Sequence, residues 1–83
     1  MHMMVKVRFL AYYRELVGGG EKLLELPEGA TVGSLVDELY RSYPRLSVHR
    51  DDVIISVNKK QAPERQKLHE GDEAVLLPPA IGG

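Results

Sequence analysis

The residues most suited to chemistry are the terminal pair Gly82-Gly83, which follow the apolar stretch Leu76-Leu77-Pro78-Pro79-Ala80-Ile81. Glycine makes up about 7% of average sequence, so a terminal pair arises by chance in only about one chain in 200. A chain end without Cβ atoms is the thinnest peptide there is, and it reaches φ values closed to other residues. Such an end can thread a narrow channel and present its α-carboxylate to another protein's active site. Gly83, with Gly82 before it, is therefore the candidate reactive residue, and a frayed tail is the alternative interpretation.

A C-terminal carboxylate has a narrow range of chemistry. Its pKa lies near 3.3–3.7, so at neutral pH it is ionised and unreactive. Activation by ATP to an acyl-adenylate makes it an acyl donor, and a nucleophile then displaces AMP. A sulfur nucleophile leaves a thiocarboxylate, whereas a lysine amine leaves an isopeptide bond. We find no nucleotide site in the 83 residues. We therefore expect no bound cofactor, with the ATP used by a partner activating enzyme.

Other constellations for catalysis are not found. The chain has no cysteine and therefore neither a thiol nucleophile nor a disulfide. His2, His49 and His69 have no partner at an informative spacing, and no metal-ligand spacing is present. Gly18-Gly19-Gly20 leads into an expected strand, whereas a phosphate-binding loop leads into a helix, so we interpret it as a turn. For the basic group, a solvated face is favoured over a docking patch; its members are Lys59, Lys60, Arg65 and Lys67.

Composition limits the partners. The net charge is −1, from 11 basic and 12 acidic side chains, which argues against a nucleic-acid or membrane-surface binder. No apolar run approaches the ~20 residues of a membrane span, and no signal peptide is recognisable. We therefore expect a cytoplasmic protein without nucleic-acid or membrane partners.

The hydrophobic pattern predicts an α+β domain. Apolar alternation predicts strands over 5–11, 22–26, 53–57, 61–62 and 73–77, with one helical turn at 13–16. Between them, Thr31 caps an amphipathic helix that Pro44 ends. The prediction is one helix packed across a mixed sheet of four to five strands, with the first and last strands as central neighbours. We expect a single domain over 4–83, with 1–3 a cloning remnant or start and 78–83 a flexible functional tail.

The expected tail has a suitable length and stiffness. Pro78-Pro79 favours an extended form, which lowers the entropy lost on insertion into a partner. Residues 78–83 span at most about 20 Å at ~3.3–3.6 Å per residue. Docking also needs an apolar patch beside the tail. Strand alternation must turn some of five candidates outward, and its register decides which: Leu10, Leu23, Ile54, Leu76 and Leu77. We include these with residues 78–81 (Pro78, Pro79, Ala80 and Ile81) as partner-binding residues.

Over residues 4–83 the chain resembles the small subunit of molybdopterin synthase, a family of ubiquitin-fold sulfur carriers. The segments that carry the resemblance are Val5-Lys6-Val7-Arg8-Phe9-Leu10-Ala11, Leu26-Pro27-Glu28-Gly29-Ala30-Thr31-Val32, Val57-Asn58, Glu70-Gly71-Asp72-Glu73 and Leu77-Pro78-Pro79-Ala80-Ile81-Gly82-Gly83. The glycine-aspartate turn, the double proline and the diglycine are jointly specific at this spacing. One departure is Ile81, where the family often has a small residue before the diglycine.

The resemblance implies a ubiquitin-like β-grasp fold and a consumed, recharged co-substrate. Gly83 would be adenylated by an enzyme similar to the ubiquitin-activating class and converted to a thiocarboxylate. The tail would insert into the large catalytic subunit and give sulfur to a pterin precursor. This chain would have no catalytic machinery of its own. Three alternatives stay open: a protein modifier joined to lysines through Gly83, a sulfur carrier for another pathway such as thiamine synthesis or tRNA thiolation, and a binding module with an incidental tail.

Overall fold

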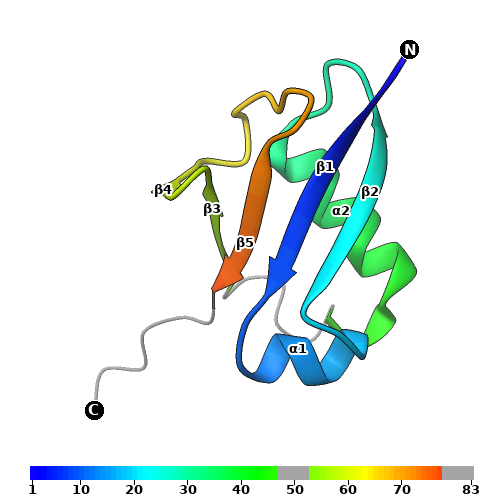
Figure 1. Cartoon of the computed structure of the whole chain (residues 1–83), viewed down its shortest axis with the longest axis vertical. Helices are drawn as coiled ribbons and strands as arrows, with labels where there is room; N and C mark the ends of the chain where they lie inside the picture. Colours follow the sequence, from blue (N-terminus) through cyan, green and yellow to red (C-terminus); the bar gives the residue numbers. More distant parts are fainter. Residues whose placement is uncertain (47–52, 78–83) are drawn as a thin grey trace.

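The computed structural model describes residues 1–46 and 53–77 (Figure 1). These residues form five strands and two helices. In chain order the elements are β1 (His2–Phe9), α1 (Tyr12–Val17), β2 (Glu21–Pro27), α2 (Val32–Ser42), β3 (Ile54–Val57), β4 (Lys60–Gln61) and β5 (Glu73–Leu77). The predicted final strand has the same bounds as β5, and the predicted helical turn after the first strand is α1.

The strands make one mixed sheet in the order β2-β1-β5-β3-β4. The central pair, β1 and β5, is parallel, while the pairs β1–β2, β3–β5 and β3–β4 are antiparallel. The first and last strands are thus central neighbours, as predicted. Helix α2 crosses one face of this sheet, and α1 lies at the end where β1 and β5 finish (Figure 1). This is the ubiquitin-like β-grasp arrangement, which confirms the predicted fold class.

Strand β1 begins earlier than predicted. It starts at His2, and Met3 is buried with Val5, Val7 and Phe9 on the side that faces the core. His2 and Met3 pair with Pro27 and Leu26 across the β1–β2 ladder. The expectation that residues 1–3 lie outside the domain is therefore wrong for these two. The predicted strand also ran two residues too far, since β1 ends at Phe9 and the chain turns at Ala11.

Helix α2 begins where Thr31 was predicted to cap it. The Thr31 hydroxyl accepts a hydrogen bond from the Ser34 amide at 3.2 Å, and the Ser34 hydroxyl accepts one from the Thr31 amide at 3.3 Å. This reciprocal capping box satisfies two amides that a helix N-terminus leaves without helical partners. Two more amides are bound by the connection between β4 and β5, because Val32 and Gly33 donate to the backbone carbonyls of residues 66 and 64 at 2.9 and 2.8 Å.

The core lies between α2 and the sheet. The helical period predicts an apolar stripe that also includes Tyr43, and the buried face of α2 carries the other members, Val32, Leu35, Val36, Leu39 and Tyr40. Tyr43 is the C-cap residue and is half-buried. Opposite this face lie the buried side chains of β1 and β5. Among the described residues, the buried apolar side chains run from Met3 to Leu76. None of its helices is long and apolar enough to cross a membrane.

Candidate functional site

The described part of the candidate site is the strand that leads to the diglycine. Leu77 ends β5, and residues 78–83, with Pro78, Pro79, Ala80, Ile81, Gly82 and Gly83, lie outside the described residues. Their predicted roles accordingly stay predictions. The structure does describe what fixes β5 and what surrounds its end.

Strand β5 is held along both edges. It pairs with β1 from Lys6↔Glu73 to Phe9↔Leu76 and with β3 from Val57↔Ala74 to Ile54↔Leu77. A strand in the middle of a sheet has its backbone groups paired on both sides, so local opening requires breaking two ladders at once. Residues 74–76 are therefore held from both sides, and Leu77, the last described residue before the tail, is paired with β3.

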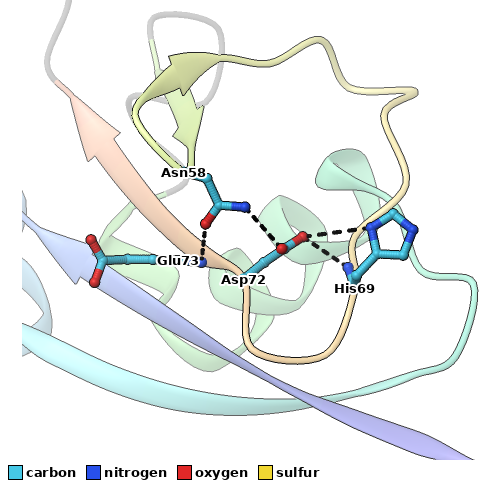
Figure 2. Close-up of polar contacts among 4 residues, drawn as sticks. All are labelled: Asn58, His69, Asp72 and Glu73. Carbon is cyan, nitrogen blue, oxygen red and sulfur yellow. Dashed lines mark hydrogen bonds and ion pairs between the residues drawn. The ribbon is translucent and has the colours of Figure 1, made fainter.

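The first residues of β5 are fixed by polar side chains (Figure 2). The Asp72 carboxylate accepts hydrogen bonds from the Asn58 side-chain amide at 2.9 Å and from the His69 backbone amide at 2.8 Å. The Asn58 side-chain oxygen in turn accepts a hydrogen bond from the Glu73 backbone amide at 3.0 Å, and the Asn58 backbone amide donates to the Glu73 backbone carbonyl at 2.8 Å. Asn58 thus bridges the turn before β4 and the start of β5.

The turn that carries Asn58 has a demanding backbone. Asn58 and Lys59 connect β3 to β4 with φ of 50° and 76°, in the left-handed region. A two-residue hairpin loop with both φ values positive matches the right-handed twist of its strands, and asparagine tolerates that conformation well. The sequence predicts this turn at either 58–59 or 59–60, and the structure places it at 58–59. Strand β4 accordingly covers 60–61 rather than the predicted 61–62.

His69 lies beside this network but is exposed. Its Nδ1 is 3.9 Å from an Asp72 carboxylate oxygen, and its side chain is 79% exposed, against 13% for that of Asp72. His69 therefore lies at the surface. Among residues 1–46 and 53–77, no cluster of three or more His, Asp or Glu side chains is placed to hold a metal ion.

Three of the five predicted docking residues gather at the end of β5. Leu77 pairs with Ile54 across the β3–β5 ladder, and both side chains are half-buried. Leu10, which is 37% exposed, comes directly after Phe9, the register partner of Leu76. We call Leu10, Ile54, Leu77 and the half-buried Val75 the tail-side patch. Val75 lies two residues before Leu77 and therefore faces the same side of the sheet. The sequence does not predict it as a docking residue, because four consecutive apolar residues in β5 give no alternation signal.

The other two predicted docking residues do not belong to this patch. Leu76 is only 1% exposed and packs in the core, so its assignment as a partner-binding residue is wrong. Leu23 is 64% exposed, but it pairs with Lys6, which pairs with Glu73 at the start of β5. It therefore lies two strands and four residues away from Leu77, roughly 10 Å across and 13 Å along the sheet.

Comparison with known proteins agrees with this architecture. The model of the ThiS family matches residues 7–83, so the chain belongs to that family, and the match includes the diglycine. Two relatives are both named molybdopterin synthase sulfur carrier subunit. The one from Mycobacterium tuberculosis is 42% identical over 60 residues, covering 72% of each chain. The one from Arabidopsis thaliana is 32% identical over 79 residues, covering 95% of this chain and 82% of the relative.

Solved structures give the same fold. Molybdopterin converting factor subunit 1 of Pyrococcus furiosus matches with a TM-score of 0.87 and 31% identity, covering 94% of this chain and 99% of that one. Small archaeal modifier protein 1 of Haloferax volcanii matches with a TM-score of 0.86 and 25% identity over 96% and 99% of the two chains. A complex of molybdopterin-converting factor subunits 1 and 2 from Helicobacter pylori contains a chain with a TM-score of 0.68 and 23% identity over 98% and 100%, a likeness of fold alone.

Proposed function

We propose that this protein is a sulfur carrier of molybdopterin biosynthesis, with the Gly83 carboxyl as the group that carries sulfur. The observation that carries the proposal is the family match through residue 83, in a chain whose relatives are named sulfur carrier subunits. A central strand that is paired along both edges and precedes the segment ending in the diglycine supports it, because a carrier needs a rigid body behind the reactive end.

The charging chemistry requires two steps at one carbonyl. In the first, a Gly83 carboxylate oxygen attacks the α-phosphorus of ATP and expels pyrophosphate, which gives an acyl-adenylate. In the second, sulfide attacks the acyl carbon and expels AMP, which leaves the thiocarboxylate; a persulfide donor gives an acyl disulfide first, and a thiol then reduces its S–S bond to release the thiocarboxylate. This chain contributes the acyl group, while the ATP and the catalytic side chains belong to the adenylating enzyme. No cofactor resides on the carrier.

Delivery requires a second partner. We propose that the tail enters the large catalytic subunit of molybdopterin synthase, where the thiocarboxylate sulfur attacks a pterin precursor and displaces an oxygen group from it. Water then hydrolyses the resulting thioester, which leaves the sulfur on the pterin and returns Gly83 as a carboxylate. The tail-side patch would contact each partner in turn, because it borders the point where the tail leaves the body. The structure from Helicobacter pylori pairs subunits 1 and 2 of a molybdopterin-converting factor, a precedent for such an assembly. We place this exchange in the cytoplasm, where ATP is available.

A direct test is intact-mass analysis after incubation with the cognate adenylating enzyme, ATP and a sulfur donor. The expected result is the mass change of one oxygen-to-sulfur exchange at Gly83, lost when Gly83 is deleted. The same exchange in the chain without Gly83 would place the sulfur elsewhere and overturn the proposal, as would no exchange in the intact chain.

A second candidate function is protein modification, favoured by the likeness to small archaeal modifier protein 1. It shares the adenylation step and differs in the nucleophile, which is a lysine amine. Cell lysate with ATP and the adenylating enzyme distinguishes the two functions. High-mass adducts through Gly83 would indicate conjugation, and free thiocarboxylate alone would indicate the carrier.

A further inference from the structure

Strand β2 forms an edge of the described sheet, and its outer side presents a regular set of unpaired backbone groups. The sheet order begins with β2, so no described strand pairs with this side. Toward β1, the register runs from His2↔Pro27 to Arg8↔Glu21. An edge strand with a free row of N–H and C=O groups is a template for pairing with another extended chain.

The direction of those groups follows from the ladder. Glu28 donates to the Met1 carbonyl at 3.0 Å, and Phe9 donates to the Gly20 carbonyl at 2.9 Å. Hydrogen-bonded pairs alternate with non-bonded pairs in an antiparallel ladder. Even-numbered residues of β2 therefore bond to β1, while Glu21, Leu23 and Glu25 point their N–H and C=O groups to the open side.

The same three residues are exposed. Alternate residues of β2 face the solvent, and these three are among them. Leu23 is 64% exposed. Lys6 and Lys22 join Glu21 and Leu23 around a shallow hollow of about 370 Å³ at this edge. The open edge thus combines backbone groups with a pattern of acid, apolar and acid at alternating positions.

This pattern selects the occupant. In a two-fold antiparallel pairing of two copies centred on Leu23, Glu21 of each copy would lie opposite Glu25 of the other. Directly opposed like charges destabilise a strand pair. A strand with an apolar residue opposite Leu23 and a basic residue two positions to either side would instead place a positive charge opposite both Glu21 and Glu25. The Glu21 carboxylate already lies 3.9 Å from the Arg8 Nε, but both side chains are about half exposed, so the carboxylate stays accessible to a second cation.

We propose that the β2 edge binds an extended segment of a partner protein with the pattern basic-x-apolar-x-basic, which adds a strand to the sheet. Backbone hydrogen bonds to Glu21, Leu23 and Glu25 supply the general affinity, and the alternating side chains supply the specificity. Because β1 separates β2 from β5, this surface stays accessible while the end of β5 is engaged. The inference does not depend on the proposed sulfur chemistry.

The test is a titration of the isotope-labelled full chain, followed by amide NMR, with the capped peptide Ser-Lys-Thr-Leu-Thr-Lys-Ser. We expect the amides of Glu21, Leu23 and Glu25 to shift and to exchange with solvent more slowly, while the β1-bonded amides of Lys22 and Leu24 change less. A peptide of the same composition ordered Ser-Lys-Lys-Thr-Thr-Leu-Ser keeps the charge and loses the alternation. It should bind at least about fivefold more weakly, since each matched cross-strand pair contributes a fraction of a kcal/mol to 1 kcal/mol.

A charge-reversed variant, Glu21→Lys with Glu25→Lys, should bind the first peptide about tenfold more weakly. Leu23→Thr, which keeps a strand-forming residue, gives a second reading if the reversed variant does not fold. Equal binding of the two peptides, shifts centred on β5, or no shift would overturn the proposal. Concentration-dependent broadening of the same three amides without peptide would identify a second copy as the occupant and would also overturn it.

Discussion

Replacing Asp72 with alanine tests whether the polar network at the start of β5 holds this strand in place. The Asp72 carboxylate accepts from the Asn58 side chain at 2.9 Å and from the His69 amide at 2.8 Å. Its side chain is 13% exposed, so water replaces these contacts poorly. Removing it leaves both donors without this acceptor and loosens the hold of Asn58 on β5.

The size of the effect follows from the two hydrogen bonds. A hydrogen bond to a charged group contributes about 1.5–3 kcal/mol, and bonds that share one carboxylate are not fully additive. We therefore expect Asp72→Ala to lower the free energy of unfolding by about 2–4 kcal/mol. In a domain with a total of about 5–15 kcal/mol, that is a large fraction.

The measurement is urea unfolding followed by far-UV circular dichroism and extrapolated linearly to water. Glu28→Ala is the matched control, because it removes one acidic side chain from an exposed position and should change stability by less than about 0.5 kcal/mol. A double-mutant cycle with Asn58→Ala should give a coupling of about 1 kcal/mol or more. A loss below about 0.5 kcal/mol in Asp72→Ala, or no coupling, would refute the anchoring role.

Three further changes test other parts of the account. Deleting Gly83 should abolish thiocarboxylation in the mass assay and leave the melting temperature unchanged, because we expect the tail to lie outside the core; a large drop in melting temperature would contradict this. Leu77→Arg should weaken binding to the adenylating enzyme about tenfold in a calorimetric titration, whereas Leu23→Arg should not, and equal effects would remove the tail-side patch as the docking surface. Ala11 has φ 51° and ψ −127°, which glycine adopts without steric cost. Ala11→Gly should therefore match or exceed the original stability, by up to about 1 kcal/mol in thermal unfolding, and a loss above about 1 kcal/mol would show that Ala11 is unstrained.

The elements with strong periodicity could be predicted from the sequence. Helix α2 has a cap at Thr31, an apolar stripe and a stop at Pro44, and three independent signals of this kind agree on one element. Strand β5 lies between the Glu70-Gly71-Asp72 turn and a double proline, so its bounds were also predictable. In contrast, the prediction places the start of β1 too late because residues 1–3 resemble a cloning remnant, although Met3 continues the buried alternation.

The inward or outward direction of side chains in β5 could not be predicted from the sequence. Residues 74–77 are all apolar, so no alternation distinguishes Leu76 from Leu77. The distinction comes from pairing, since Leu76 lies beside the buried Phe9 and Leu77 beside Ile54. The Asn58–Asp72 contact is likewise a property of the fold, because it joins two turns 14 residues apart that meet only when β3 and β5 pair.

The central claim is that sulfur travels on the terminal carboxyl of this chain and leaves it during the reaction with the pterin. The most direct measurement is a single-turnover reaction of the thiocarboxylated protein with the large subunit and the pterin precursor, in which carrier mass and dithiolene are both quantified. A dithiolene holds two sulfur atoms, so the account predicts two thiocarboxylates converted to carboxylates for each dithiolene formed. Dithiolene formation with the thiocarboxylate left intact would contradict it.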